Sequence, residues 1–139
     1  MIDSLKFKII TPKRKDKTKV VEIYINEIEL IDIVSPIEIP FATKENHPEL
    51  AGDYEHQTME ELYYHLTKYS ENVELLCCKG CGFAGCWSIT INIEIDDKYV
   101  YWKGFKNNHR DWEYNISYKF DRVKYENELK QLYNAIEKG

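Results

Sequence analysis

Four cysteines lie close together near the middle of the chain, in the segment 77–86 (CCKGCGFAGC). Cys78 and Cys81 have the Cys-x-x-Cys spacing that allows two thiolates to bind one metal ion, and Gly82 after them permits the tight turn. Zinc prefers four thiolate or imidazole ligands in a tetrahedral array. A second Cys-x-x-Cys or a Cys-x-x-His is missing from the sequence. The pattern predicts a candidate zinc site formed by Cys78, Cys81, Cys86 and His109.

Other interpretations of these cysteines stay open. Small cysteine and glycine side chains let two strands approach closely, and unpaired cysteine is among the most buried residue types, so packing alone can explain the segment. Alternatively, Cys86 acts as a nucleophile with His109 as its base. A redox pair is disfavoured because such pairs lie at helix N-termini, whereas this segment leads into a strand. Cys77 is an alternative to His109 as the fourth zinc ligand.

Two further segments carry side chains that bind ions or partners. The segment 53–56 (DYEH) offers two carboxylates and an imidazole, which suit a metal ion or acid–base chemistry. The segment 108–112 (NHRDW) places an imidazole, a guanidinium and an indole in one loop, which suits an anion or a protein partner. Packing of Arg110 over Trp112, with Asp111 as a local partner, is the alternative. The candidate partner-binding residues are His109, Arg110, Trp112, Asp53 and Tyr54.

Charge and composition narrow the class of protein. The 139 residues fit one domain, and the formal net charge of −5 argues against general affinity for nucleic acid or anionic membranes. There is no run of 18 apolar residues and no secretory signal, so we expect a cytoplasmic protein with reduced cysteines. The sequence contains no Gly-rich phosphate loop, nucleophile elbow or His-Glu-x-x-His motif, and we assign no catalytic residue.

The elements that must position these residues are indicated by periodicity. Alternating apolar residues and short apolar runs predict strands at 5–9, 21–25, 28–34, 73–77, 89–95, 99–105 and 112–120. A capping box of Thr58 and Glu61 begins a helix that ends near Ser70, and Asp121 is the expected N-cap of a C-terminal helix. The segment 40–57 is expected to be a long connection. We therefore predict an α+β fold in a single domain, 1–139, with a mainly antiparallel sheet of six to seven strands and two helices.

With these segments in view, the chain resembles a family of uncharacterised bacterial proteins. The matching segments are 38–42 (EIPFA), 50–54 (LAGDY), 85–87 (GCW), 102–112 with its His-Arg pair, and 120–122 (FDR) followed by Tyr125. Members of the family have their first cysteines spaced Cys-x-Cys, whereas Cys78 and Cys81 are one residue further apart. The resemblance implies a shared fold and no particular activity.

The functional prediction follows from what the sequence has and lacks. We expect a non-enzymatic binding or interaction protein with a protein partner, which binds neither nucleic acid nor membrane. The alternative is a zinc-binding or thiol-dependent protein that uses the segment 77–86. A shared site for the cysteines and His109 requires that both loops lie at the same end of the sheet.

Overall fold

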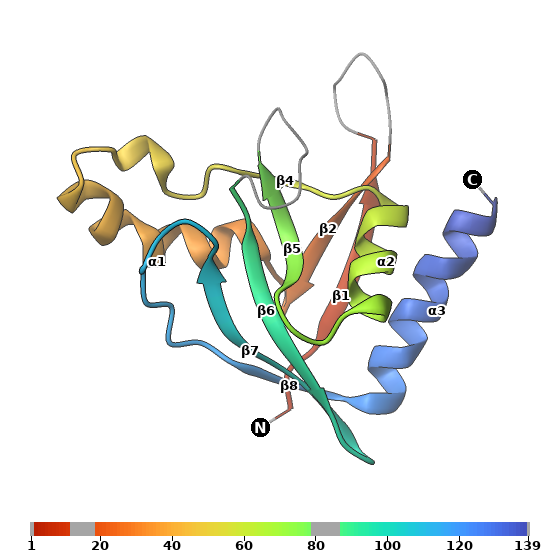
Figure 1. The fold of residues 1–139 in the computed structure, drawn as a ribbon. Coiled ribbons are helices and arrows are strands. Elements are labelled where there is room, and N and C mark those ends of the chain that lie inside the picture. Colours follow the sequence, from red (N-terminus) through yellow and green to blue (C-terminus); the bar gives the residue numbers. More distant parts are fainter. Residues whose placement is uncertain (1, 12–18, 79–86, 139) are drawn as a thin grey trace.

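The computed structural model describes residues 2–11, 19–78 and 87–138 (Figure 1). In these ranges the chain forms eight strands, three α-helices and one short 3₁₀ helix. The elements in chain order are β1 (Leu5–Ile10), β2 (Val20–Ile25), β3 (Ile28–Glu29), α1 (Leu30–Lys44), η1 (Pro48–Leu50), β4 (Tyr54–His56), α2 (Met59–Lys68), β5 (Val73–Cys78), β6 (Ile89–Ile95), β7 (Tyr99–Asn107), β8 (Tyr118–Asp121) and α3 (Arg122–Lys138). The α+β class predicted from the sequence is confirmed.

The strands form two antiparallel sheets. One has three strands in the order β1-β2-β3, and the other has five in the order β4-β5-β6-β7-β8. Backbone hydrogen bonds join the sheets at two places: Val21 N–H donates to the Gln57 carbonyl at 2.9 Å, and Asp3 N–H donates to the Lys119 carbonyl at 2.7 Å. These bonds connect strand β2 with the segment before α2, and the start of the chain with β8.

The two faces of the larger sheet differ at its central strand, β6. One face packs into the hydrophobic core, and the other, here called the open face, lines a cleft described below. Ile89, Ile91 and Ile93 lie in the core, as their alternation predicted. On the other face, Glu74, Thr90 and Lys106 are cross-strand neighbours on β5, β6 and β7. One row of side chains thus carries an acid, a hydroxyl and a base.

Helix α2 begins with the predicted capping box. The Thr58 hydroxyl accepts from the Glu61 N–H at 3.2 Å, and the Glu61 carboxylate accepts from the Thr58 N–H at 3.2 Å. The helix packs against β5 and α3, and α2 and α3 lie side by side in Figure 1, on the other side of the sheets from α1. His65 in the last turn of α2 lines the same cleft as Glu74 of β5.

The predicted strand 28–34 and the predicted connection 40–57 are wrong. Only Ile28 and Glu29 are in a strand, and α1 runs from Leu30 to Lys44 through two prolines, Pro36 and Pro40. Isoleucine, valine and proline lower local helix propensity, which explains the error. The helix is stabilised instead by a buried stripe at every fourth position, which consists of Leu30, Val34, Glu38 and Ala42.

The predicted last strand, 112–120, is shorter in the structure. Strand β8 begins only at Tyr118, and Asn115 in the preceding segment has a left-handed backbone with φ of 51°. Trp112 and Tyr114 alternate as a strand would, but both are buried in an irregular segment. Three helices and eight strands in two sheets thus replace the expected two helices and single sheet of six to seven strands. Within the described ranges, no helix has the length and apolar character needed to cross a membrane.

Candidate functional site

A buried glutamate holds together three segments that are distant in sequence. Glu38 on α1 is fully buried. One of its carboxylate oxygens accepts from the Gly52 N–H at 2.8 Å, and the other accepts from the hydroxyls of Tyr54 and Tyr114. Burial raises the pKa of Glu38, and its three donors act in the opposite direction. Asn107 at the end of β7 extends the network, because its amide donates to the Tyr54 hydroxyl at 2.9 Å.

An aromatic cluster lies beside this network. The Trp87 ring stacks on the rings of His109 and Tyr54, each at a centroid distance of 6.4 Å. The Arg110 guanidinium lies 5.2 Å above the Trp87 ring. Arg110 therefore packs over Trp87, not over Trp112 as expected.

Glu45, just after α1, holds the turn that carries these groups. It accepts from Arg110 Nε at 2.9 Å and from Trp112 Nε1 at 2.7 Å. These two donors lower the pKa of the Glu45 carboxyl, with the Trp112 indole contributing most. Glu45 thus takes the role that the sequence assigned to Asp111.

The candidate partner-binding residues meet in this region but differ in accessibility. Tyr54 and Trp112 are only 4% and 6% exposed, and both donate hydrogen bonds to glutamates inside the fold. His109 is exposed, and Arg110 and Asp53 are half-buried. Tyr54 and Trp112 consequently position the loop, whereas His109 and Arg110 are able to meet a ligand.

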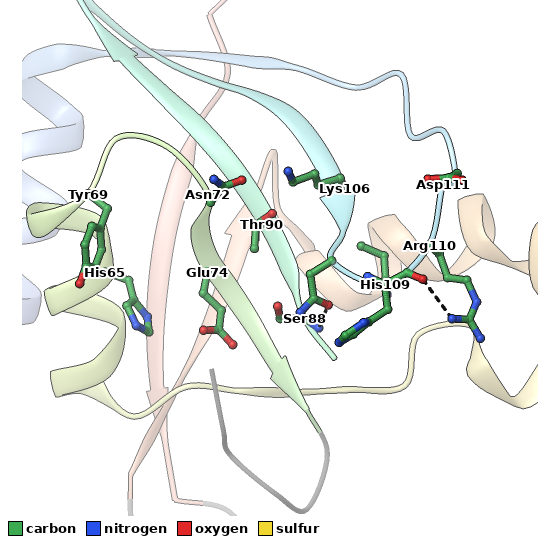
Figure 2. Close-up of a pocket in the computed structure, with 12 residues that line it drawn as sticks. His65, Tyr69, Asn72, Glu74, Ser88, Thr90, Lys106, His109, Arg110 and Asp111 are labelled. Atoms are coloured by element: carbon green, nitrogen blue, oxygen red, sulfur yellow. Dashed lines mark hydrogen bonds between the residues drawn. The ribbon is translucent and has the colours of Figure 1, made fainter. Parts of the chain in front are cut away.

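A cleft of about 850 Å³ opens on the other side of His109 and Arg110 (Figure 2). We call it the Glu74 cleft. Its walls come from the end of α2 and the turn after β7, and its floor is the cross-strand row on the open face of the sheet. The described lining residues are His65, Tyr69, Asn72, Glu74, Ser88, Thr90, Lys106, Asn107, Asn108, His109, Arg110 and Asp111.

Two floor residues of the cleft each carry a buried side-chain oxygen that no described group bonds. Glu74 and Thr90 are 8% and 7% exposed, and within the described ranges no group bonds to Glu74 Oε1 or Thr90 Oγ1. Burial raises the pKa of Glu74 to about 7, and the negative charge of Glu61 adds to this effect. An unpaired buried polar group costs roughly 1–3 kcal/mol, so native proteins contain few of them.

Gln57 fixes the tautomer of His65, which lies on the wall of the cleft. Its Nε2 donates to the Glu74 carbonyl at 2.6 Å, so its Oε1 is the acceptor for His65 Nδ1–H. Burial lowers the pKa of His65, which favours the neutral ring. With the proton on Nδ1, Nε2 carries a lone pair and is a further hydrogen-bond acceptor.

Neither Glu74 nor His65 was singled out from the sequence. The available signal was a single acid inside the apolar run 73–77 (VELLC). A carboxylate in a strand that is otherwise buried is unfavourable unless a hydrogen-bond partner or a bound ligand compensates for its burial. His65 gave no such signal, because its bond to Gln57 depends on tertiary contacts.

The segment 53–56 does not gather into one site. The His56 imidazole pairs with Glu29 across the two sheets, with Nε2 at 2.6 Å from Oε1. Glu55 lies opposite Cys77, and the Cys77 thiol donates to the Glu55 carbonyl at 3.4 Å. Both arrangements have structural roles, in joining the sheets and in placing β4 beside β5.

Of the predicted zinc ligands, Cys78 and His109 are described, whereas Cys81 and Cys86 lie outside the described residues. Cys78 ends β5, and Trp87 on the far side of the segment stacks on His109. Cys78, Trp87 and His109 therefore lie at the same end of the sheet. The described part of the chain contains no group of three or more histidine, cysteine or acidic side chains placed to hold a metal.

No family model, curated protein or solved structure matches this chain. The resemblance to a bacterial family therefore stays a prediction. Its segments nonetheless meet in space: Glu38 from the first bonds to Gly52 and Tyr54 from the second, and Trp87 stacks on His109. Of the residues in these contacts, His109 also lines the Glu74 cleft.

Proposed function

We propose that this protein is a non-enzymatic binding protein whose ligand enters the Glu74 cleft. The contrast between two buried glutamates carries the proposal. Glu38 has hydrogen-bond donors on both oxygens, whereas Glu74 Oε1 has none among the described residues. A buried acceptor that faces a cleft is stabilised when a ligand supplies the missing donor.

The size and lining of the cleft agree with this role. Clefts of about 300–1,000 Å³ hold small ligands or a single inserted side chain. The lining is rich in amide, hydroxyl and charged groups, so the ligand is polar. The absence of a complete catalytic motif in the sequence favours binding over turnover.

The first test compares the two glutamates by the same substitution. Glu74→Met removes the unpaired carboxylate, and we expect the free energy of unfolding to rise by about 1–2 kcal/mol, as is common when a functional polar group is replaced. Glu38→Met leaves two hydroxyls and one N–H without their acceptor, and we expect a loss of about 3 kcal/mol or more. Urea denaturation measures both. Equal destabilisation by the two substitutions would make Glu74 a structural residue and refute the proposal.

The second part of the test looks for the ligand. Thermal denaturation is followed with separate panels of aliphatic amines, amino acids, monosaccharides and inorganic phosphate. We expect at least one class to raise the melting temperature of the wild type but not of Glu74→Met or the isosteric Thr90→Val. The ligand should be recovered unchanged by mass spectrometry. Stabilisation that persists in both variants would place the site elsewhere.

Zinc binding is the second candidate function. It is supported by the position of Cys78, Trp87 and His109 at one end of the sheet. If His109 is one of the four zinc ligands, the other three must be the thiolates of Cys78, Cys81 and Cys86. Metal content is measured in protein purified without chelator or affinity tag. One equivalent of zinc that is lost in both Cys81→Ser and Cys86→Ser would support this function, and metal-free protein would remove it.

A further inference from the structure

We propose that the Glu74 cleft binds an organic ammonium group, for which Glu74 is the counter-ion. The inference deepens the binding function proposed above and depends on it. It rests on the hydrogen-bonding groups that the cleft offers, on the charges around Glu74, and on the aromatic ring at the edge of the cleft.

The groups around the floor of the cleft include three acceptors. Within the described ranges, Glu74 Oε1 and Thr90 Oγ1 have no donor, and the neutral His65 ring keeps a lone pair on Nε2. An ammonium group has three N–H donors and no acceptor, so it is able to satisfy such a set. A carboxylate or phosphate ligand would instead bring further acceptors to Glu74.

Among the described residues, no cation is paired with the Glu74 carboxylate. Arg110 is held by Glu45 at 2.9 Å. Lys106 stands on the third strand of the cross-strand row, and neighbouring Cα atoms in such a row are about 4.5–5.5 Å apart, so its backbone lies roughly 10 Å from that of Glu74. Among the described residues, the charged and titratable groups around Glu74 are Glu61 and His65 from α2, Tyr69 just after it, Lys106 from β7, and His109, Arg110 and Asp111 from the turn.

The edge of the cleft suits the carbon chain that carries an amine. Tyr69 lines the cleft beside His65, with ring centroids 6.4 Å apart, and is 49% exposed. An aromatic ring attracts a cation near its face and packs against methylene groups. Both a free alkylamine and the side chain of a partner's lysine have this chemistry.

The experiment follows the backbone amides of the cleft by NMR during titration at pH 8, where most Glu74 side chains are ionised. The probes are n-butylammonium chloride, with 1-butanol and sodium butyrate as neutral and anionic controls. We expect the amine to shift the Glu74 and Thr90 amides and the two controls to have no effect. Glu74→Met should weaken amine binding at least tenfold, and Lys106→Met, which removes a positive charge from the same row, should strengthen it.

A second arm separates the two sources of the ammonium group. An N-acetylated, C-amidated Gly-Lys-Gly peptide is compared with the free amine. Tighter binding of the peptide would assign the cleft to a lysine of a protein partner, and tighter binding of the amine to a small ligand. Either result supports the inference.

Four outcomes would overturn it. Equal binding of 1-butanol and the amine would show that charge is not recognised. Binding that is gained only in Lys106→Met would show that Lys106 reaches across the row and is itself the counter-ion. A monosaccharide that depends on Glu74, without amine binding, would refute this inference while the binding function stands. Failure of every probe class, together with destabilisation by Glu74→Met, would refute both.

Discussion

Glu38 and Glu74 are the acidic side chains that the fold buries among the described residues, and their surroundings differ in one respect. Tyr54, Tyr114 and Gly52 converge on Glu38, and each supplies a donor. Glu74 is approached by Gln57 only at its backbone carbonyl. The same residue type thus holds the structure together at one position and remains available at the other.

The raised pKa of Glu74 predicts a component of stability that depends on pH. The pKa is about 7 in the folded protein and about 4.5 in the unfolded chain, so between these values the folded state keeps a proton that the unfolded state has lost. Stability therefore falls as pH rises from about 4.5 to 7, by up to roughly 3 kcal/mol at 1.36 kcal/mol per pKa unit. Glu74→Met removes this component.

Urea denaturation at pH 5, 6, 7 and 8 measures the effect. We expect the stability advantage of Glu74→Met over the wild type to grow across this range and to level off at pH 8. Glu38 is present in both proteins, so its own titration cancels in the difference. A difference that stays constant with pH would show that Glu74 titrates normally.

At the scale of elements, the sequence predicts the helix ends and strands that interactions between neighbouring residues stabilise. The capping box of Thr58 and Glu61, the alternation through 89–95 and the N-cap at Asp121 all appear as expected, and Asp121 accepts from the Lys124 N–H at 3.0 Å. Helix α1 was missed because tertiary burial stabilises it against its own composition. Glu38 interrupts its apolar stripe, and the donors that make Glu38 tolerable lie 14 to 76 residues away.

The candidate site, like the elements, was predictable only in part. The sequence named His109 and Arg110 as candidate partner-binding residues on one loop, and the structure places both in the lining of the cleft. It did not identify Glu74 or Thr90, because an acid or a threonine in a strand has no special spacing. Their significance arises only where two neighbouring strands and α2 meet.

At the scale of the whole molecule, the start of the chain is held by β8 and by the turn after β2. Asp3 Oδ2 accepts from the Lys119 N–H at 2.8 Å, and Asp3 Oδ1 accepts from the Asn26 side chain at 2.9 Å. These bonds connect the three-stranded sheet to the far edge of the five-stranded one. The stability of the two sheets is therefore shared.

Removal of the Asp3 carboxylate should weaken the molecule as a whole. We expect Asp3→Ala to lower the free energy of unfolding by about 1–2 kcal/mol and to speed hydrogen exchange at the Lys119 amide. Asp97→Ala is the matched control, since Asp97 is an exposed acid at the tip of the β6–β7 hairpin. If the two variants had the same stability, the connection through Asp3 would contribute nothing measurable.

The contact between the first strand and the end of the chain also sets an order of events during protein synthesis. Asp3 bonds to a residue 116 positions later, and the Phe7 N–H donates to a glutamate 121 positions later. A ribosome adds roughly 5–20 residues per second, so on the order of ten seconds separate the emergence of these partners. The hairpin of β1 and β2 is able to form early, but its outer edge stays unpaired until α3 has left the exit tunnel. A growing chain therefore exposes this edge to chaperones and to neighbouring nascent chains until α3 has emerged.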